Sequence, residues 1–498
     1  MKKTSSQEIV RVHRRQFVIG PREFLARSDW RTFELQSNLI LSADPELRVG
    51  KTTDKNGVSW FLLGLAVDTR PEFTTPLEEI SRRPTEDVSR LYEGWAGRWA
   101  LIGGNYLHLD AAAMLGCYYG KNANGELWAS SSPVLIKQVL GLNELPSKLD
   151  SDNSNSWQPL PDATVRGEVR GISCYPPPHS SIPGVFRLLP SQILDLQTGS
   201  YQPRNLTGYI EGNHTDIELF EAIQLSLSTA IKGFAALNAS KDLTLLLSGG
   251  RDSRILMSIA AATGISVRTY TRIHRRASLA DRTLPPKLAS IAGYPHTKQY
   301  HRNEISGRRQ AIYEHAGYNE SWLSAEEFLR GGSDPLTGIA LAGFCAALGR
   351  DRLIPVTSAQ EATGEIIARH YSESNSPELV AAFDAWITLR RKHNADPSLD
   401  LCDYFFLEQR TAGRKGIKEQ IFDLFPAERV APLNSARIFA LICNLSGETK
   451  QNALWISEII KSTTPELLRY PMNPPDKYFG SIRNTFLNNH FYRWMIGL

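Results

Sequence analysis

Cysteine is scarce in this chain, with five residues in 498. The cysteines are scattered, and no two of them form a Cys-x-x-Cys pair. They are Cys117, Cys174, Cys345, Cys402 and Cys443. Without paired spacing, neither a disulfide framework nor a cysteine-ligated zinc site is expected. Other residue types therefore carry the chemistry of this chain.

Long apolar runs are also missing, and none reaches the length needed to cross a membrane. The first 20 residues are basic but lack the continuous apolar core of a secretion signal. We therefore expect a cytoplasmic protein with no membrane partner.

An excess of charge of one sign is missing as well. The net charge is +4 with 22% charged residues, so nothing indicates a nucleic-acid partner. Three short basic runs cover 272–276, 390–392 and 414–418. We expect the last two runs to be solvated surface. The first run follows a predicted strand, where a phosphate or an acidic substrate could lie.

What the chain does have is length and a change of pattern near residue 210. With 498 residues, of which 42% are hydrophobic, two or three folded domains are expected. Residues 1–210 contain short apolar runs between turn residues, which predict a β-rich region. Strands are predicted at 60–67, 97–102, 106–109, 127–129 and 193–196.

Residues 211–498 show alternating strand and helix patterns instead. Thr215 and Glu218 form a capping box, and apolar residues at helical spacing follow it. Further strands are predicted at 243–247, 267–271, 297–300 and 338–343. This alternation predicts a parallel sheet with helices on both faces. From about residue 360 onward the pattern is mostly helical.

The most informative segment is Ser248-Gly249-Gly250-Arg251-Asp252-Ser253, which lies directly between an apolar strand and a helix. Its two glycines let the backbone turn sharply and come close to a ligand. The free amides at the start of a helix bind anions. Asp252 stands where a carboxylate can hold Mg²⁺ against a phosphate. The pattern favours a phosphate site over an ordinary glycine-rich turn.

This segment resembles the SGGxDS loop of ATP pyrophosphatases, which split ATP into AMP and pyrophosphate. Most of the chain is similar to the asparagine synthetase superfamily, which includes β-lactam synthetases and lasso-peptide cyclases. Further landmarks are the runs 94–101, 110–119, 129–131, 186–190 and 281–293. The resemblance implies an α/β and α+β fold. An N-terminal Ntn-hydrolase-like β-sandwich would precede an adenine-nucleotide α-hydrolase-like parallel sheet with a helical C-terminal part.

The resemblance implies a glutaminase-like domain over 1–210 and an asparagine synthetase-like ATP-pyrophosphatase domain over 211–498. Glutaminases of this family carry a nucleophilic cysteine directly after the initiator methionine, whereas this chain has Lys2 there. A thiolate attack on glutamine from that position is therefore not available. We expect the first domain to be degenerate, without glutaminase activity, and to serve structure or substrate recognition.

A second departure lies in the loop after the strand at 338–343. Family members have a glycine-rich acidic loop there, whose acidic residue supports Mg²⁺–pyrophosphate and whose first glycine precedes a Glu or Tyr. Here Gly343 allows close approach to the nucleotide, but Phe344 takes the Glu/Tyr position and Ala347 replaces the carboxylate. Phe neither takes nor gives a proton. Asp351 is a candidate substitute.

The resemblance also implies catalytic residues further along the chain. Family members use a lysine on a C-terminal loop to stabilise negative charge at the adenylate. Lys477 is the candidate here, with Lys450 as the runner-up, and a plain surface lysine is the alternative for both. Glu408 is a candidate base on the substrate side, or else an ion-paired helix residue.

The implied activity is an ATP- and Mg²⁺-dependent amide ligase that works through an acyl-adenylate. Ser248, Gly249, Gly250 and Ser253 would bind phosphate, and Asp252 would hold Mg²⁺. The acid would be a small molecule or a peptide, and without a glutaminase the amine would belong to the substrate. This suggests lactam or macrolactam formation, or peptide modification, in natural-product biosynthesis.

Partners and alternatives stay open at this point. A precursor peptide or a biosynthetic partner protein is expected in the first scheme. A second scheme is a catalytically impaired homologue that binds nucleotide or peptide and scaffolds a biosynthetic partner. A third is a ligase that uses free ammonia.

Overall fold

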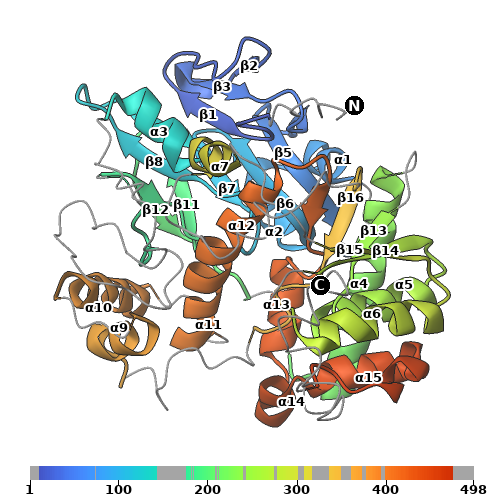
Figure 1. Cartoon of the computed structure of the whole chain (residues 1–498). Helices are drawn as coiled ribbons and strands as arrows, with labels where there is room; N and C mark the ends of the chain where they lie inside the picture. Colours follow the sequence, from blue (N-terminus) through green and yellow to red (C-terminus); the bar gives the residue numbers. More distant parts are fainter. Residues whose placement is uncertain are drawn as a thin grey trace, which may run out of the picture.

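The computed structural model shows a mixed α/β protein with antiparallel sheets in its first part and a parallel sheet in its second (Figure 1). It describes residues 11–72, 75–142, 175–180, 182, 184–207, 210, 212–238, 243–273, 277–300, 308–316, 336–348, 361–372, 377–393 and 399–474.

The first part contains two six-stranded antiparallel sheets. In order, the first consists of β10 (Phe186–Arg187), β8 (Tyr118–Lys121), β9 (Leu127–Ser130), β1 (Phe17–Gly20), β3 (Ile40–Ala43) and β2 (Arg31–Glu34). The second consists of β12 (Tyr201–Pro203), β11 (Gln192–Asp195), β7 (Tyr106–Leu109), β6 (Trp95–Gly103), β5 (Ser59–Asp68) and β4 (Val49–Thr53).

The two sheets share one core because side chains alternate along each strand. Phe17 and Ile19 of β1 belong to the same buried cluster as Phe61 of β5. Val18, between them, joins a cluster on the opposite face of its sheet. Helices contribute to these outer clusters. They are α3 (Pro133–Leu140) on the first sheet, and α1 (Pro76–Ser81) and α2 (Val88–Glu93) on the second.

The second part is built on a five-stranded parallel sheet. In order, its strands are β15 (His296–Tyr300), β14 (Val267–Ile273), β13 (Leu243–Leu246), β16 (Ile339–Ala342) and β17 (Glu428–Val430). The chain moves outward from β13 in one direction and later in the other. The strand order therefore reverses between β13 and β16, which is where open α/β sheets bind ligands.

Helices follow and alternate with these strands; some pack on the sheet, whereas the helix at 308–316 lies beside the first part of the chain (Figure 1). They are α4 (Asp216–Leu237), α5 (Arg251–Ala262), α6 (Leu279–Ile291), α7 (Arg308–Ala316), α9 (Gly364–Ser372), α10 (Pro377–Lys392), α11 (Leu401–Phe405), a π-helix (Phe406–Lys415), α12 (Gly416–Phe422), α13 (Ala436–Cys443), α14 (Gly447–Asn452) and α15 (Leu454–Thr463). None of the helices that the structure describes has the length and apolar character needed to cross a membrane.

The elements predicted from apolar patterns are confirmed, with ends that shift by a few residues. The strand predicted at 106–109 is β7, and the capping box of Thr215 and Glu218 starts α4. Several strands were not predicted. Strands β2 and β4 carry no continuous apolar run, and β10 has only two residues, whereas β1 and β3 are apolar and largely buried and were missed as well. Pairing with neighbouring strands forms these elements, and a local pattern does not show that.

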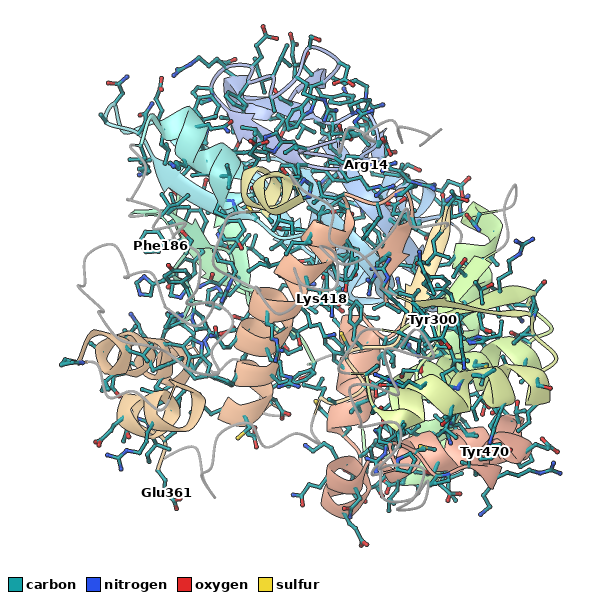
Figure 2. The ribbon with its side chains drawn as sticks, viewed as in Figure 1. Arg14, Phe186, Tyr300, Glu361, Lys418 and Tyr470 are labelled. Atoms are coloured by element: carbon teal, nitrogen blue, oxygen red, sulfur yellow. The ribbon has the colours of Figure 1, made fainter. Side chains whose placement is uncertain are left out.

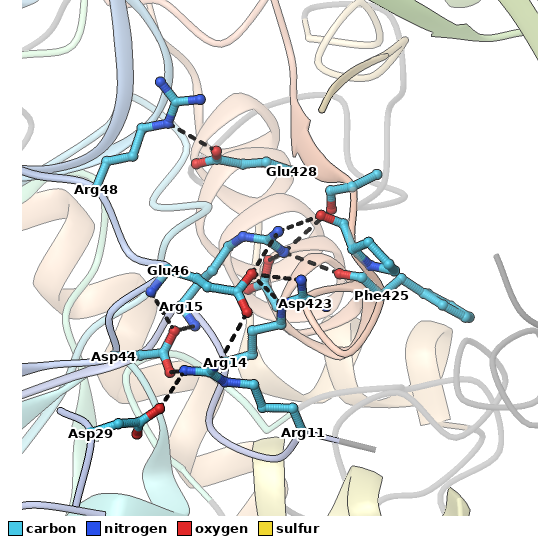
Figure 3. A network of polar contacts seen from close by, with 12 residues as sticks. Arg11, Arg14, Arg15, Asp29, Asp44, Glu46, Arg48, Asp423, Phe425 and Glu428 are labelled. Atoms are coloured by element: carbon cyan, nitrogen blue, oxygen red, sulfur yellow. Dashed lines mark hydrogen bonds and ion pairs between the residues drawn. The ribbon is translucent and has the colours of Figure 1, made fainter. Parts of the chain in front are cut away.

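Buried ion pairs and main-chain contacts join the two parts. Arg98 of β6 donates two hydrogen bonds to Asp423, at 2.7 and 2.6 Å, and both side chains are buried. Figure 3 shows Arg15 reaching the carbonyl of Phe425, at 3.2 Å, from the N-terminal segment. The predicted boundary at residue 210 lies between β12 and α4, and it stays a prediction.

Candidate functional site

The turn Ser248-Gly-Gly-Arg-Asp-Ser253 lies between β13 and α5, at the point where the strand order reverses. Helix α5 begins at Arg251, so Asp252 and Ser253 belong to its first turn. Gly250 is the N-cap residue. The sequence prediction of a strand, a sharp turn and a helix is therefore confirmed at this place. We call residues 248–253 the phosphate turn.

Side-chain oxygens hold the amides of the phosphate turn. The Gly249 amide donates to Asp281 Oδ1 at 2.8 Å, and the Gly250 amide donates to Ser248 Oγ at 3.1 Å. The Ser248 amide donates to Ser253 Oγ at 3.1 Å. Asp281 comes from the first turn of α6, and Ser278, the N-cap residue of that helix, donates to its other oxygen. Side chains of the turn and of α6 thus hold these three amides in place, and Ser248 and Ser253 add hydroxyls at the cavity.

Gly343, directly after β16, lies against the start of α5. A β-carbon on Gly343 would stand 2.5 Å from the Ser253 nitrogen and 2.6 Å from the Asp252 carbonyl carbon. Only glycine leaves room for this approach. Two residues later, Cys345 has a φ of 76°, a conformation that side chains rarely adopt. Strained residues of this kind often cluster at functional sites.

A cavity of about 250 Å³ opens beside the phosphate turn. It lies at the carboxyl ends of β13, β14 and β16, as expected at a point of strand-order reversal. Of the residues predicted to bind the nucleotide, Ser248, Ser253 and Gly343 line it. Gly249, Gly250 and Asp252 belong to the adjoining turn.

Cations predominate on the cavity wall. Among the described residues, the charged ones that line it are Arg272, Asp281, Lys415, Lys418 and Arg429. Arg429 is paired with buried Glu419, at 2.8 Å. Arg272 stacks on the ring of Phe425, with 4.8 Å between guanidinium and ring centroid. The cavity therefore favours an anionic ligand.

The lysines come from one face of a helix. Lys415 ends the π-helix, and Lys418, Phe422 and Phe425 follow at intervals of three, four and three residues. This spacing places Lys415, Lys418 and Phe422 on one helix face, and Phe425 follows in the turn after α12. All four line the cavity. Lys415 Nζ lies 5.8 Å from the ring centroid of Phe344, which also lines the cavity. Figure 2 labels Lys418 near the centre of the molecule.

Two expectations about basic runs need correction. The runs 390–392 and 414–418 were expected to be solvated surface. Lys415 and Lys418 instead line the cavity, and Arg390 is buried, whereas Arg391 and Lys392 are exposed as expected. The sequence showed that 414–418 is basic. It did not show which part of the fold this helix packs against. Of the run 272–276, Arg272 lines the cavity, and residues 274–276 lie outside the described residues.

Glu408 occupies a buried ion pair away from the cavity lining. Arg390 lies 3.1 Å from its Oε1, and the Trp386 indole donates to its Oε2 at 2.7 Å. Ser191 also donates to Oε1. Both oxygens thus have partners, and Glu408 is fully buried. The structure therefore favours the ion-paired alternative for Glu408 over the catalytic base.

The other candidates fall in different places. Lys477 and Asp351 lie outside the described residues. Lys450 lies on α14, where its Nζ donates to the Cys443 carbonyl at 3.5 Å, and it does not line the cavity. Phe344 lines the cavity, and Ala347 is buried in the same loop.

The carboxylates here are too few to hold a metal by themselves. No group of three or more His, Cys, Asp or Glu side chains gathers in the part of the chain that the structure describes. Mg²⁺ usually binds one or two carboxylates together with substrate phosphates. Asp252 in the first turn of α5 fits that role only with oxygens from a bound phosphate.

Cys117 is the earliest cysteine, and its side chain is fully buried. Burial raises the pKa of its thiol well above the ordinary value. A thiol of this kind stays protonated at neutral pH, so Cys117 does not act as a thiolate nucleophile.

Comparison with protein-family models and with curated proteins returned no match.

Proposed function

We propose that this protein is an ATP-dependent ligase that activates a carboxylate as an acyl-adenylate and joins it to an amine. One observation carries the proposal. A cavity at the point of strand-order reversal is lined by Ser248 and Ser253 of the phosphate turn and by Lys415 and Lys418. Amides at a helix start and nearby cations are what a polyphosphate requires.

In this scheme a substrate carboxylate oxygen attacks the α-phosphorus of ATP. The bond to the β-phosphate breaks, and pyrophosphate leaves with its electron pair. The phosphate turn would bind the departing pyrophosphate, while Lys415 and Lys418 would add positive charge across the cavity. Mg²⁺ held by Asp252 would neutralise phosphate charge. An amine then attacks the acyl carbon, AMP leaves, and the amine proton passes to solvent.

The proposal includes the family resemblance. The two antiparallel sheets with outer helices support an Ntn-hydrolase-like first domain, and the parallel sheet supports an adenine-nucleotide α-hydrolase-like second domain. Lys2 at the nucleophile position and buried Cys117 favour a first domain without glutaminase activity. The amine would then belong to the substrate, as in lactam-forming and lasso-peptide-cyclising enzymes of natural-product biosynthesis. Free ammonia is the other source.

The test is pyrophosphate release with ATP and a panel of carboxylates, with wild type and Asp252→Asn. The substitution keeps the size of the side chain but removes the charge, so Mg²⁺–ATP affinity should fall by on the order of 2–3 kcal/mol. Calorimetry measures this fall. Glu448→Gln removes one exposed charge in α14 and serves as the control. Unchanged affinity in Asp252→Asn would mean that the turn has only a structural role.

A second candidate function is a nucleotide-binding scaffold without catalysis. The loop after β16 favours it, since Phe344 lines the cavity and buried Ala347 stands where a carboxylate is expected. Ala347→Asp would restore the charge with little added volume. Increased pyrophosphate release would support a ligase with a weakened site. If both proteins bind ATP but release no pyrophosphate with any acid, the scaffold is the better description.

A further inference from the structure

Arg254 connects the phosphate turn to the segment that follows α15. Its side chain is fully buried, and all of its hydrogen bonds go to main-chain carbonyls. One Nη donates to Leu467 at 3.2 Å and to Tyr470 at 2.5 Å. The other donates to Gly249 at 3.2 Å and to Pro471 at 3.1 Å. We call residues 465–473 the docking segment, and Figure 2 labels Tyr470 within it.

The docking segment makes a second contact with the same peptide group. The Asn473 amide donates to the Gly249 carbonyl at 3.1 Å. A β-carbon on Gly250 would stand 3.0 Å from Oδ1 of Asn473, so the side chain lies directly against the turn. The Gly249 carbonyl therefore accepts from both Arg254 and Asn473, which fixes the orientation of its peptide plane.

This orientation matters because of the geometry of a trans peptide. The carbonyl of Gly249 and the amide of Gly250 belong to one planar unit and point in opposite directions. Since Arg254 and Asn473 hold the carbonyl on the docking-segment side, the Gly250 amide points the other way. There it donates to Ser248 Oγ, and Ser248 lines the cavity. Arg254 thus helps to aim a donor that a bound anion would use.

The charge of Arg254 is consistent with an anion nearby. No carboxylate pairs with it among the described residues, and its acceptors are neutral carbonyls. Burial lowers its pKa to about 10. A buried cation without a counter-charge is costly. A phosphate bound at the turn would supply the missing negative charge.

We propose that Arg254 is a positioning residue that couples binding of a phosphate-bearing ligand at the turn to docking of residues 465–473. This inference rests on the proposed function, because it takes a polyphosphate as the ligand. Coupling between two events is reciprocal. Ligand at the turn should therefore protect the docking segment, and a poorly docked segment should weaken ligand binding.

The experiment uses the full chain with inorganic pyrophosphate as the probe. Calorimetry measures pyrophosphate affinity, and hydrogen exchange measures protection of amides 465–473. In wild type, pyrophosphate should slow exchange in the docking segment. Arg254→Met should bind pyrophosphate at least about tenfold more weakly, and its docking segment should exchange faster. The reason is that the hydrogen bonds to the docking segment and the positive charge are both lost. Arg254→Lys keeps the charge but not the four carbonyl contacts, so it should fall between the two.

Arg469→Met is the matched control, since Arg469 is exposed, lies in the docking segment and carries the same charge. It should behave as wild type. If Arg254→Met does not fold, Arg254→Lys and the wild-type exchange experiment still decide the question. Wild-type affinity in a folded Arg254 variant, or wild-type exchange that pyrophosphate leaves unchanged, would overturn the coupling while the proposed function stands. If wild type binds neither pyrophosphate nor ATP, the proposed function fails and the coupling fails with it.

Discussion

Gly343→Ala is expected to weaken nucleotide binding because it forces β16 away from the start of α5. The added β-carbon would meet the Ser253 nitrogen at 2.5 Å and the Asp252 carbonyl carbon at 2.6 Å. Both contacts are with backbone, which has no rotamer to move aside. Inserting a methyl group into a packed site costs about 1–3 kcal/mol. If the displaced turn bears this cost, ATP affinity falls by about 5- to 150-fold.

Calorimetry with Mg²⁺–ATP, together with urea unfolding, tests this expectation. Gly447→Ala is the matched control, because Gly447 begins α14 and a β-carbon there meets nothing within 4 Å. Alanine favours helix over glycine by up to about 1 kcal/mol, so the control should unfold no earlier than wild type. If Gly343→Ala binds and unfolds like wild type, the close approach of β16 to the phosphate turn is not required.

Acidification should destabilise the fold through two buried histidines. Burial lowers the pKa of His108 and of His315 to about 3, so both are neutral in the folded chain. The unfolded chain takes up these protons below about pH 6.5, and stability therefore falls between pH 6.5 and 3, by about 1.4 kcal/mol per histidine and pH unit. Urea unfolding at pH 7 and pH 5 measures the loss, and an unchanged midpoint would contradict it. Glu408→Gln should destabilise the chain by about 3–5 kcal/mol, because it leaves buried Arg390 without its counter-charge. Mg²⁺–ATP affinity should not change, and a stable variant that has lost turnover would instead indicate a catalytic base.

The elements that apolar patterns predicted are those whose own residues decide the structure. The long alternating strand β5 and the capped helix α4 are examples. Strand β17 is different, since its three residues are followed by Ala431 and Pro432, and only pairing with β16 makes it a strand. The reversal of strand order between β13 and β16 depends on where the fifth strand joins the sheet. That information comes from packing between distant segments.

The phosphate turn could be predicted from the sequence because all of its residues lie in one short segment. Two glycines, a carboxylate and two hydroxyls follow a strand within six residues, and a backbone turn needs nothing from elsewhere. The contacts of Arg254 could not be predicted from the sequence. It stands in the same sequence run, but three of its four hydrogen bonds go to carbonyls more than 200 positions away. A residue next to a motif can therefore bind a distant segment without any sign in the motif.

The helix that carries Lys415 and Lys418 could be predicted in part. Its sequence showed the character of one helix face, but not what that face packs against. The spacing of Lys415, Lys418 and Phe422 already placed two cations and one ring on one helix face, and Phe425 follows after the helix ends. A face that mixes rings with cations is unusual for solvated surface, because exposed aromatic side chains leave apolar area in water. This periodicity was a stronger signal than the basic run itself. It predicts that this face packs against another part of the protein. That part is the end of the parallel sheet, and its position depends on the path of the whole chain.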